Sequence, residues 1–261
     1  MIPNSAGIGK VDLLRLRLLA CSALTREICW CVARSPNRID PVFIEKGAHN
    51  HPDRLRERLQ RLIDEASAEE YDRILLAYGL CGRATDGLTA RNLPVIIPRA
   101  HDCATLLTGS REAFLRCFGD QLSRPWTSAS YAERNSGGDF SAPNALWTNG
   151  EPDFTELAAR YGEEGAQVVL DTLRQYRTED GELWFIDIPE TSHPAVVQAL
   201  EAAAAYKGLV LKRIPGSISL LQRLVDGPWA PEDYLVLEPG CRIEALFDHE
   251  QVIRAVPEST P

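Results

Sequence analysis

The sequence predicts an α/β protein with a Rossmann-like, mainly parallel sheet and helices on both of its faces. Short apolar runs of strand length alternate along the chain with segments of helical period. This alternation favours parallel strands joined by helical connections. With 261 residues the chain is long enough to bury a substantial core, either as a single α/β domain over 1–261 or as two similar halves.

The first half is expected to contain four strand–helix units. A strand over residues 13–20 leads into a helix whose first turn Ser22 can cap with its hydroxyl. Because later apolar runs are also followed by a helical period, the same unit should repeat. The three further units cover 41–66, 72–90 and 94–118.

Residues 120–150 break this rhythm, since they are rich in Ser, Gly, Asn, Pro and aromatic residues. They predict an irregular connection, 121–150, that either closes over a site as a lid or joins two halves. The halves would be a cysteine-bearing unit over 10–120 and a second α/β unit over 151–250. The final segment, 251–261, is short, polar and proline-containing, and it is expected to form a frayed tail.

The second unit is expected to repeat the architecture of the first without its sequence. Helical segments around 152–177 come first, and apolar runs then alternate with helical periods. In chain order these are the strand 183–189, the helix 194–206, the strand 208–214, the helix 217–227 and the strand 234–239.

Charge and composition restrict the class of partner. The formal net charge is −9 at pH 7 and no sustained run of Lys or Arg occurs, which argues against nucleic acid or an anionic membrane. No uncharged apolar stretch reaches about 18 residues and no apolar signal segment follows a basic start, so we expect a cytoplasmic protein. Seven cysteines without a secreted spacing pattern predict reduced thiols. A small-molecule substrate or a protein partner is favoured.

Three cysteines, Cys21, Cys81 and Cys103, share a position just after an apolar run and close to a helix start. Because parallel strands end at one edge of a sheet, loops far apart in sequence should meet there. Helix N-termini lower the pKa of a nearby thiol, and thiolates are metal ligands. The three thiols could hold a [4Fe-4S] iron–sulfur cluster with one iron open to substrate. Alternatively, they could hold a zinc ion with His101 or a water.

A structural role is the alternative for these thiols, because cysteine is a common small buried residue after a strand. Cys241 follows a later strand and a Pro-Gly turn, and it could reach the same edge if the two halves pack face to face. The remaining cysteines are expected to be packing residues, namely Cys29, Cys31 and Cys117.

Charged residues close to the cysteines are further candidates. His101 and Asp102 precede Cys103 directly, and they could orient a metal or act as general acid and base. Asp102 could instead simply cap the following helix. Arg99 and Arg83 flank the same loops and could bind a carboxylate or phosphate, or pair with acids at the surface.

Tyr78 and His49 complete the candidate substrate-binding residues. Tyr78 precedes the segment 79–82, in which glycines on both sides of Cys81 permit positive φ and close approach of a ligand. A plain tight turn needs the same glycines. His49 and His51 lie in a strand-to-helix loop, two residues apart, although Pro52 at the first helical position explains this loop without a metal.

A resemblance to the bacterial and archaeal family known as domain of unknown function 1638 extends over nearly the whole chain. It is carried by LLACSALTREI, HNHPDRL, ILLAYGLCGRATDGL and VIIPRAHDCATLLTGSREAF. Pro125-Trp126 departs from this pattern, in which a Gly-Trp would be expected. The resemblance implies that these segments form the site, but it implies no established reaction. It also implies a loose association with corrinoid-dependent methyl-transfer systems.

Three cysteines on strand-end loops are also similar to the arrangement in quinolinate synthase, where an open [4Fe-4S] cluster acts as a Lewis acid. The leading hypothesis is therefore a metal-dependent lyase or transferase acting on a small polar substrate. In it His101 and Asp102 transfer protons and Arg99 binds an anionic group. One alternative is a non-catalytic accessory protein that handles a metal or corrinoid in C1 methyl transfer. The other is a metal-free enzyme with Cys81 or Cys103 as nucleophile and His101 as base.

Overall fold

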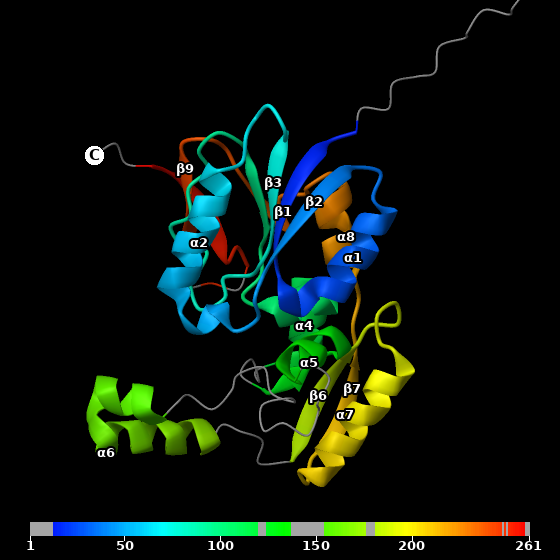
Figure 1. Ribbon diagram of the computed structural model, residues 1–261, viewed down its shortest axis with the longest axis vertical. Helices are drawn as coiled ribbons and strands as arrows, with labels where there is room; N and C mark the ends of the chain where they lie inside the picture. Colours follow the sequence, from blue (N-terminus) through cyan, green and yellow to red (C-terminus); the bar gives the residue numbers. More distant parts are fainter. Residues whose placement is uncertain are drawn as a thin grey trace, which may run out of the picture.

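The computed structural model describes residues 13–119, 124–136, 154–175, 181–246, 248 and 250–258. Its main sheet consists of β1 (Arg15–Cys21), β2 (Arg38–Ile44), β3 (Arg73–Ala77), β4 (Val95–Pro98) and β8 (Tyr234–Leu237). The strand order is β2-β1-β3-β4-β8 (Figure 1). The first four strands run parallel, and β8 is antiparallel to β4. The predicted α/β class is confirmed.

Helices cover both faces of this sheet (Figure 1). α1 (Thr25–Arg34) connects β1 to β2 on one face, where α8 (Ser219–Asp226) packs beside it. α2 (Pro52–Asp64) connects β2 to β3 and lies on the opposite face. The change of face creates a topological switch point between β1 and β3, and α/β sheets bind ligands outside the carboxyl ends of the strands at such points.

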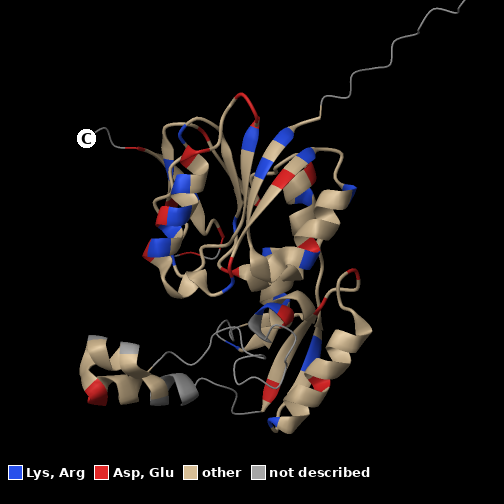
Figure 2. Cartoon of the chain, in the orientation of Figure 1, with Lys and Arg blue, Asp and Glu red and all other residues tan. Residues whose placement is uncertain are grey.

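The sequence pattern of α2 explains its place in these layers. Leu55, Leu59 and Ile63 recur every four residues and are buried, while most of the charged residues between them are exposed. Figure 2 shows acidic and basic residues interspersed along this helix. The sheet beneath is covered on both faces, which is why β3 and β4 are nearly continuous buried apolar runs.

A second, smaller sheet lies beyond the carboxyl ends of the main sheet (Figure 1). It contains three parallel strands, β5 (Trp126–Thr127), β6 (Glu182–Asp187) and β7 (Val210–Pro215). The helices α5 (Ala129–Ser136) and α7 (Pro194–Tyr206) accompany it. After β7 the chain returns to the main sheet through α8 and β8, whereas the sequence analysis placed 151–250 together in one unit.

The chain end was expected to fray from residue 251, and this prediction is wrong for 253–257. These residues form β10 (Ile253–Pro257), which pairs antiparallel with β9 (Cys241–Ala245). Val252 and Ile253 are 0 % and 1 % exposed, so their burial against the core anchors the strand.

The segment 79–90 was expected to continue into a helical period, but it forms turns instead. Gly82 and Gly87 adopt positive φ values of 64° and 85°. Ile243 in β9 accepts a hydrogen bond from Gly87 N (2.8 Å) and donates one to Leu88 O (2.8 Å). The backbone of this segment is therefore bonded to β9, which a helix would not allow.

Short helices follow the strands at the carboxyl edge of the main sheet. They are η1 (Ser22–Leu24), η2 (Ala48–Asn50), α3 (Cys103–Thr108) and α4 (Arg111–Phe118). The Asp102 side chain accepts a hydrogen bond from Thr105 N (3.2 Å), and the Ser110 hydroxyl accepts one from Ala113 N (3.1 Å). These caps fix where α3 and α4 begin.

Parts of the predicted connection 121–150 lie outside the described residues, and the predicted lid falls largely there. Its described part, 124–136, forms β5 and α5. α6 (Phe154–Gln175), near the predicted helical segments of 152–177, lies apart from both sheets in Figure 1. Within the described ranges, none of the helices combines the length and apolar character needed to cross a membrane.

Candidate functional site

The carboxyl ends of four adjacent strands bring the candidate residues together. Because the order is β2-β1-β3-β4, the loops that leave these strands stand in a row. In the parallel register Cys21 pairs with Ile44, and Ala20 pairs with Ala77. Tyr78 therefore follows β3 beside the end of β1. Taken in strand order, the row carries Lys46, Cys21, Tyr78 with Cys81, and Cys103.

The three predicted thiols gather around Cys103. Cys103 is in the middle, since its thiol is hydrogen-bonded to Cys21 and to Cys81. Cys21 is buried, whereas Cys81 and Cys103 are half-buried, so that solvent reaches two of the three residues. Cys241 lies apart from them at the start of β9. We call Cys21, Cys81 and Cys103 the thiol cluster.

Main-chain hydrogen bonds hold two of these loops together. Leu80 N donates to Ala100 O (2.8 Å), and Cys81 N donates to His101 O (2.9 Å). The two bonds join the turn after β3 to the loop after β4 as if they were neighbouring strands. Because these are backbone contacts, they fix the position of Cys81 relative to Cys103 independently of the side chains.

Gly79 makes this close approach possible. An added Cβ at Gly79 would lie 2.7 Å from Asp102 N and 2.9 Å from Ala100 O, which is too close for any side chain. The carbonyl of Gly79 accepts a hydrogen bond from the buried Thr85 hydroxyl (3.2 Å). Cys81 itself has a φ of 46°, a left-handed conformation that is unfavourable for a residue with a Cβ. Such strain is frequent at functional sites.

The electrostatics of the thiol cluster differ from one thiol to the next. The hydrogen bond from Cys103 lowers the pKa of Cys21; burial opposes this, and the Ala23 N–H and the Lys46 charge reinforce it. The same hydrogen bonds, to Cys21 and Cys81, raise the pKa of Cys103 well above its usual value, and burial raises it further. Cys21 should therefore lose its proton before Cys103 does.

Lys46 is a member of the site that the sequence analysis missed. Its ammonium lies 3.4 Å from the ring centroid of Tyr131 in α5 and donates to the Tyr131 carbonyl (3.3 Å). Its backbone N donates to the Ser22 hydroxyl (2.8 Å), which joins the loop after β2 to the loop after β1. Burial lowers the pKa of Lys46 to about 7, while the charges of Cys21 and Cys103 raise it.

A sequence signal for Lys46 existed, because it follows an apolar run just as the cysteines do. No such signal exists for Tyr131, because it lies in the segment that was predicted to be an irregular connection. Tyr131 is nonetheless 3 % exposed, and burial raises its pKa, as do the charges of the thiol cluster. Its phenol is therefore within electrostatic range of all three thiols.

Tyr78, a predicted substrate-binding residue, lies within electrostatic range of all three thiols. It is 2 % exposed, and burial raises its pKa, with further increases from the charges of the three thiols. Among the described residues its hydroxyl has no hydrogen-bond partner. A buried hydroxyl without a partner is unfavourable, and it indicates a place where a bound molecule would complete the site.

Tyr78 and Tyr234 form a matched pair for a test of stability. Tyr234 is equally buried, but its hydroxyl donates to Leu220 O (2.6 Å). Tyr234→Phe should lower the free energy of unfolding by about 1 kcal/mol, because it removes a hydrogen bond. Tyr78→Phe should leave it unchanged or raise it. Urea unfolding measures both, and a loss in Tyr78→Phe as large as in Tyr234→Phe would show that the Tyr78 hydroxyl is bonded in the folded protein.

His101 and Asp102 have structural contacts beside any catalytic role. Asp102 caps α3, and burial raises the pKa of its carboxyl, which the Thr105 N–H opposes. Backbone N–H groups of residues 250–252 lower the pKa of Asp248, and His101 adds to this effect. His101 is thus within electrostatic range of the loop before β10. Their roles in proton transfer remain predictions.

The guanidinium of Arg99 binds backbone carbonyls. It donates to Pro231 O (2.8 Å), Gln251 O (3.0 Å) and Ile253 O. These are backbone carbonyls before β8 and around β10. The side chain therefore ties the chain end to the loop after β4, and the predicted clamp on an anionic group has no support from this arrangement.

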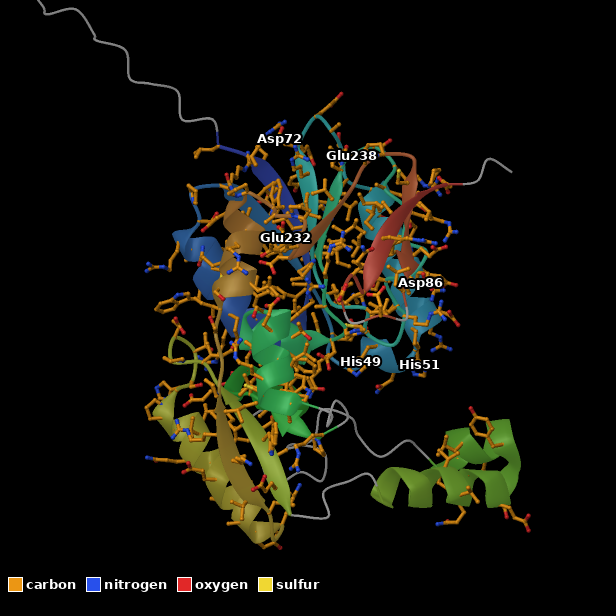
Figure 3. All side chains as sticks on the ribbon, turned by 180° about the vertical axis from the view of Figure 1, so that it is seen from behind. His49, His51, Asp72, Asp86, Glu232 and Glu238 are labelled. Atoms are coloured by element: carbon orange, nitrogen blue, oxygen red, sulfur yellow. The ribbon has the colours of Figure 1, made fainter. Side chains whose placement is uncertain are left out.

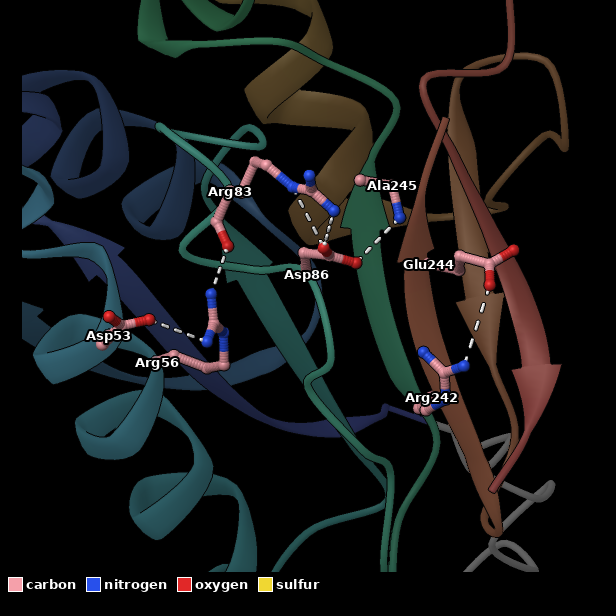
Figure 4. Close-up of polar contacts among 7 residues, drawn as sticks. All are labelled: Asp53, Arg56, Arg83, Asp86, Arg242, Glu244 and Ala245. Atoms are coloured by element: carbon pink, nitrogen blue, oxygen red, sulfur yellow. Dashed lines mark hydrogen bonds and ion pairs between the residues drawn. The ribbon is translucent and has the colours of Figure 1, made fainter. Parts of the chain in front are cut away.

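Arg83 and His49 lie beside the thiol cluster on the side of α2. Arg83 pairs with Asp86 through Nε (3.1 Å) and Nη2 (2.6 Å), and its carbonyl accepts from Arg56 (2.9 Å) (Figure 4). His49 lies in η2 at the start of α2, as Figure 3 shows together with His51. An added Cβ at Gly82 would come within 3.8 Å of His49 O, so η2 borders the turn that carries Cys81.

The thiol cluster does not yet form a coordination group. In the described ranges no set of three or more His, Cys, Asp or Glu side chains is arranged to hold a metal ion. All seven cysteines are free thiols. What the structure provides is therefore three sulfur donors centred on Cys103, with an ammonium and two phenols around them.

Two open surface hollows lie elsewhere on the molecule. One of about 690 Å³ is lined by α2 and by Glu258, with charges of both signs. The other, about 640 Å³, lies between α1 and the loop that precedes α7, and Trp30 and His193 are among its lining residues. The thiol cluster lines neither of them, so we do not assign the site to a hollow.

Comparison with known proteins gives a family and no relative with a described role. No curated protein matches the chain, and no solved structure does. A family model described as "Protein of unknown function (DUF1638)" matches residues 43–225. The matched range includes Lys46, Tyr78, Cys81 and Cys103. Because it covers more than half of the sequence, and as the sequence resemblance predicted, the chain belongs to the DUF1638 family.

Proposed function

We propose that this protein is a metal-dependent enzyme in which Cys21, Cys81 and Cys103 bind a thiophilic metal ion next to a small polar substrate. The observation that supports this most is the interaction of Cys103 with both Cys21 and Cys81, three residues from three separate loops. Those loops meet at the topological switch point of a parallel sheet, where α/β proteins bind ligands. A purely structural role would not require three cysteines to meet.

The donor set fits such an ion in its chemistry. Sulfur ligands favour zinc, iron–sulfur clusters and other soft metals. Metal binding would displace thiol protons, because thiolates are the ligands. The described side chains do not yet enclose an ion, so binding would include their rearrangement. Lys46 would offset part of the negative charge of three thiolates.

The interactions of Cys103 with the other two thiols favour a single metal ion over an iron–sulfur cluster. A single ion would be held by all three thiolates together, which agrees with the interaction of Cys103 with both Cys21 and Cys81. A [4Fe-4S] cluster holds each thiolate on a different iron and would separate them further. Zinc is therefore the first candidate, and an iron–sulfur cluster is the second.

When bound, such an ion supplies Lewis-acid polarisation of a substrate oxygen. This chain's own residues provide the surroundings. Cys81 and Cys103 are half-buried, whereas Cys21 is buried. The Tyr78 hydroxyl can donate a hydrogen bond, and the Lys46 ammonium adds a positive charge. Asp102 holds the start of α3, and with it Cys103, in place.

Metal content after purification without oxygen tests the proposal. Wild type should contain about one zinc per chain. Cys103→Ser should lose at least about nine tenths of it, because the central ligand is removed. Cys117→Ser is the matched control, since Cys117 is also half-buried but lies in α4. Its metal content should equal that of wild type.

Other results would contradict the proposal in distinct ways. Equal metal content in wild type and in the single serine variants at all three positions would show that the thiol cluster does not bind the metal. Iron with acid-labile sulfide would replace the single ion by an iron–sulfur cluster. A metal-free protein inactivated by alkylation would favour a cysteine nucleophile, although the raised pKa of Cys103 weighs against that residue. Tight binding of a corrinoid protein without turnover would favour an accessory role.

A further inference from the structure

Two polar groups, the Tyr78 hydroxyl and the Lys46 ammonium, lie beside the thiol cluster. Tyr78 carries a buried hydroxyl with no hydrogen-bond partner among the described residues. Lys46 carries a half-buried ammonium that rests on the face of the Tyr131 ring, 3.4 Å from its centroid. Both are within electrostatic range of Cys21 and Cys103. They leave adjacent parts of the same sheet edge, Lys46 after β2 and Tyr78 after β3, on either side of β1.

We propose that Tyr78 and Lys46 bind the carboxylate of a small anionic substrate next to the thiol cluster. The role of this molecule as a substrate rests on the proposed function, whereas its binding does not. The Tyr78 hydroxyl donates one hydrogen bond to a carboxylate oxygen, and the Lys46 ammonium supplies the opposite charge. The hydroxyl that is unsatisfied in the free protein thereby gains its partner.

The number and kind of donors favour a carboxylate over a phosphate. A carboxylate presents two oxygens, which one hydroxyl and one ammonium can serve. Phosphate has more oxygens and more charge, and protein sites for it typically add an arginine or several backbone N–H groups. The nearby arginines Arg83 and Arg99 are engaged with Asp86 and with backbone carbonyls. Arg83 and Arg99 therefore do not join Tyr78 and Lys46 in a phosphate-binding site.

The surroundings strengthen this pair. The ammonium is held by the Tyr131 ring and the Tyr131 carbonyl, so little side-chain freedom is lost when an anion binds. Partial burial lowers the local dielectric and makes the charge more effective than it would be at the surface. The Ser22 hydroxyl fixes the Lys46 backbone and so its position relative to Cys21.

Isothermal titration of the purified full chain with pyruvate, malonate and succinate at neutral pH tests the inference. Wild type should bind at least one of these probes, and inorganic phosphate should bind more weakly. Lys46→Met keeps the aliphatic stem, and Tyr78→Phe keeps the ring. Each should weaken binding of that probe by about tenfold to a hundredfold, as expected for loss of a hydrogen bond or charge at an anion. Tyr234→Phe and the exposed Lys212→Met are the matched controls and should bind as wild type does.

The outcomes separate this inference from the proposed metal site. Each titration is performed with metal-free and with zinc-loaded protein, and zinc content is measured for every variant. Carboxylate binding that both substitutions weaken supports the inference even if wild type holds no zinc. No binding of any carboxylate, or equal binding by wild type and both folded variants, would overturn it even if zinc is present. Preferential binding of phosphate would overturn the assignment of a carboxylate.

Discussion

Gly79→Ala is expected to lower the free energy of unfolding by about 3 kcal/mol, at the upper end of the usual cost of overpacking. The added Cβ would lie 2.7 Å from Asp102 N, 2.8 Å from Asp102 Cα and 2.9 Å from Ala100 O. These are backbone atoms, so the strain cannot be relieved by a side-chain rotation. The turn that carries Cys81 would have to move away from the loop that carries Cys103.

Urea unfolding, together with zinc content, checks this prediction. Gly208→Ala is the control, because Gly208 also lies in a turn but has nothing within 4 Å of an added Cβ. Its φ of 71° should cost the alanine variant only about 1–2 kcal/mol. Gly79→Ala should also lose metal, since the bonds that position Cys81 are disrupted. A variant as stable as wild type would mean that the two loops are not packed as closely as described.

Glu27→Gln is expected to stabilise the protein at neutral and alkaline pH by about 1–3 kcal/mol, the usual cost of burying a polar group without full compensation. Glu27 in α1 is 0 % exposed and accepts a hydrogen bond from the Thr191 hydroxyl (2.7 Å). Burial raises the pKa of its carboxyl, and the Thr191 hydroxyl offsets only part of this. Glutamine keeps the shape and an acceptor oxygen without the charge.

The sign of the pH dependence follows from the raised pKa. Below the unfolded value of about 4.3, both states carry the proton and Glu27 does not penalise folding. As the pH rises from there through the folded pKa, the unfolded state loses the proton first, and stability falls. Unfolding measured between about pH 4 and about pH 8 should show this slope in wild type and not in Glu27→Gln. The exposed Glu201→Gln should keep the slope, and an unchanged slope in Glu27→Gln would contradict the prediction.

The sequence pattern predicted the placement of the cysteines because a general rule for parallel sheets applies. Cys21, Cys81 and Cys103 each follow an apolar run, and parallel strands end at one edge. At that edge the structure places Cys103 where it interacts with both Cys21 and Cys81. The strand order, which sets Cys21 between Lys46 and Tyr78, depends on long-range pairing that no local pattern reveals.

Contacts made over long sequence distances explain what the sequence did not predict. Arg99 carries a guanidinium, which is suited to binding anions. Its carbonyl partners, Pro231 and Gln251, lie more than a hundred positions later in the chain. β10 appeared frayed because its pairing partner, β9, had not been recognised as a strand. Tyr131 has no spacing signal, since only the docking of α5 on η1 brings it to the site.

Cobalt(II) titration of the reduced, metal-free protein tests the central claim most directly, because thiolate-to-cobalt charge-transfer bands report sulfur coordination. The account predicts intense bands that saturate at about one equivalent per chain, as for a single tetrahedral site. They should persist in Cys117→Ser and be lost in Cys103→Ser. A titration without charge-transfer bands, or one in which Cys103→Ser responds as wild type does, would contradict the claim that the thiol cluster binds a metal.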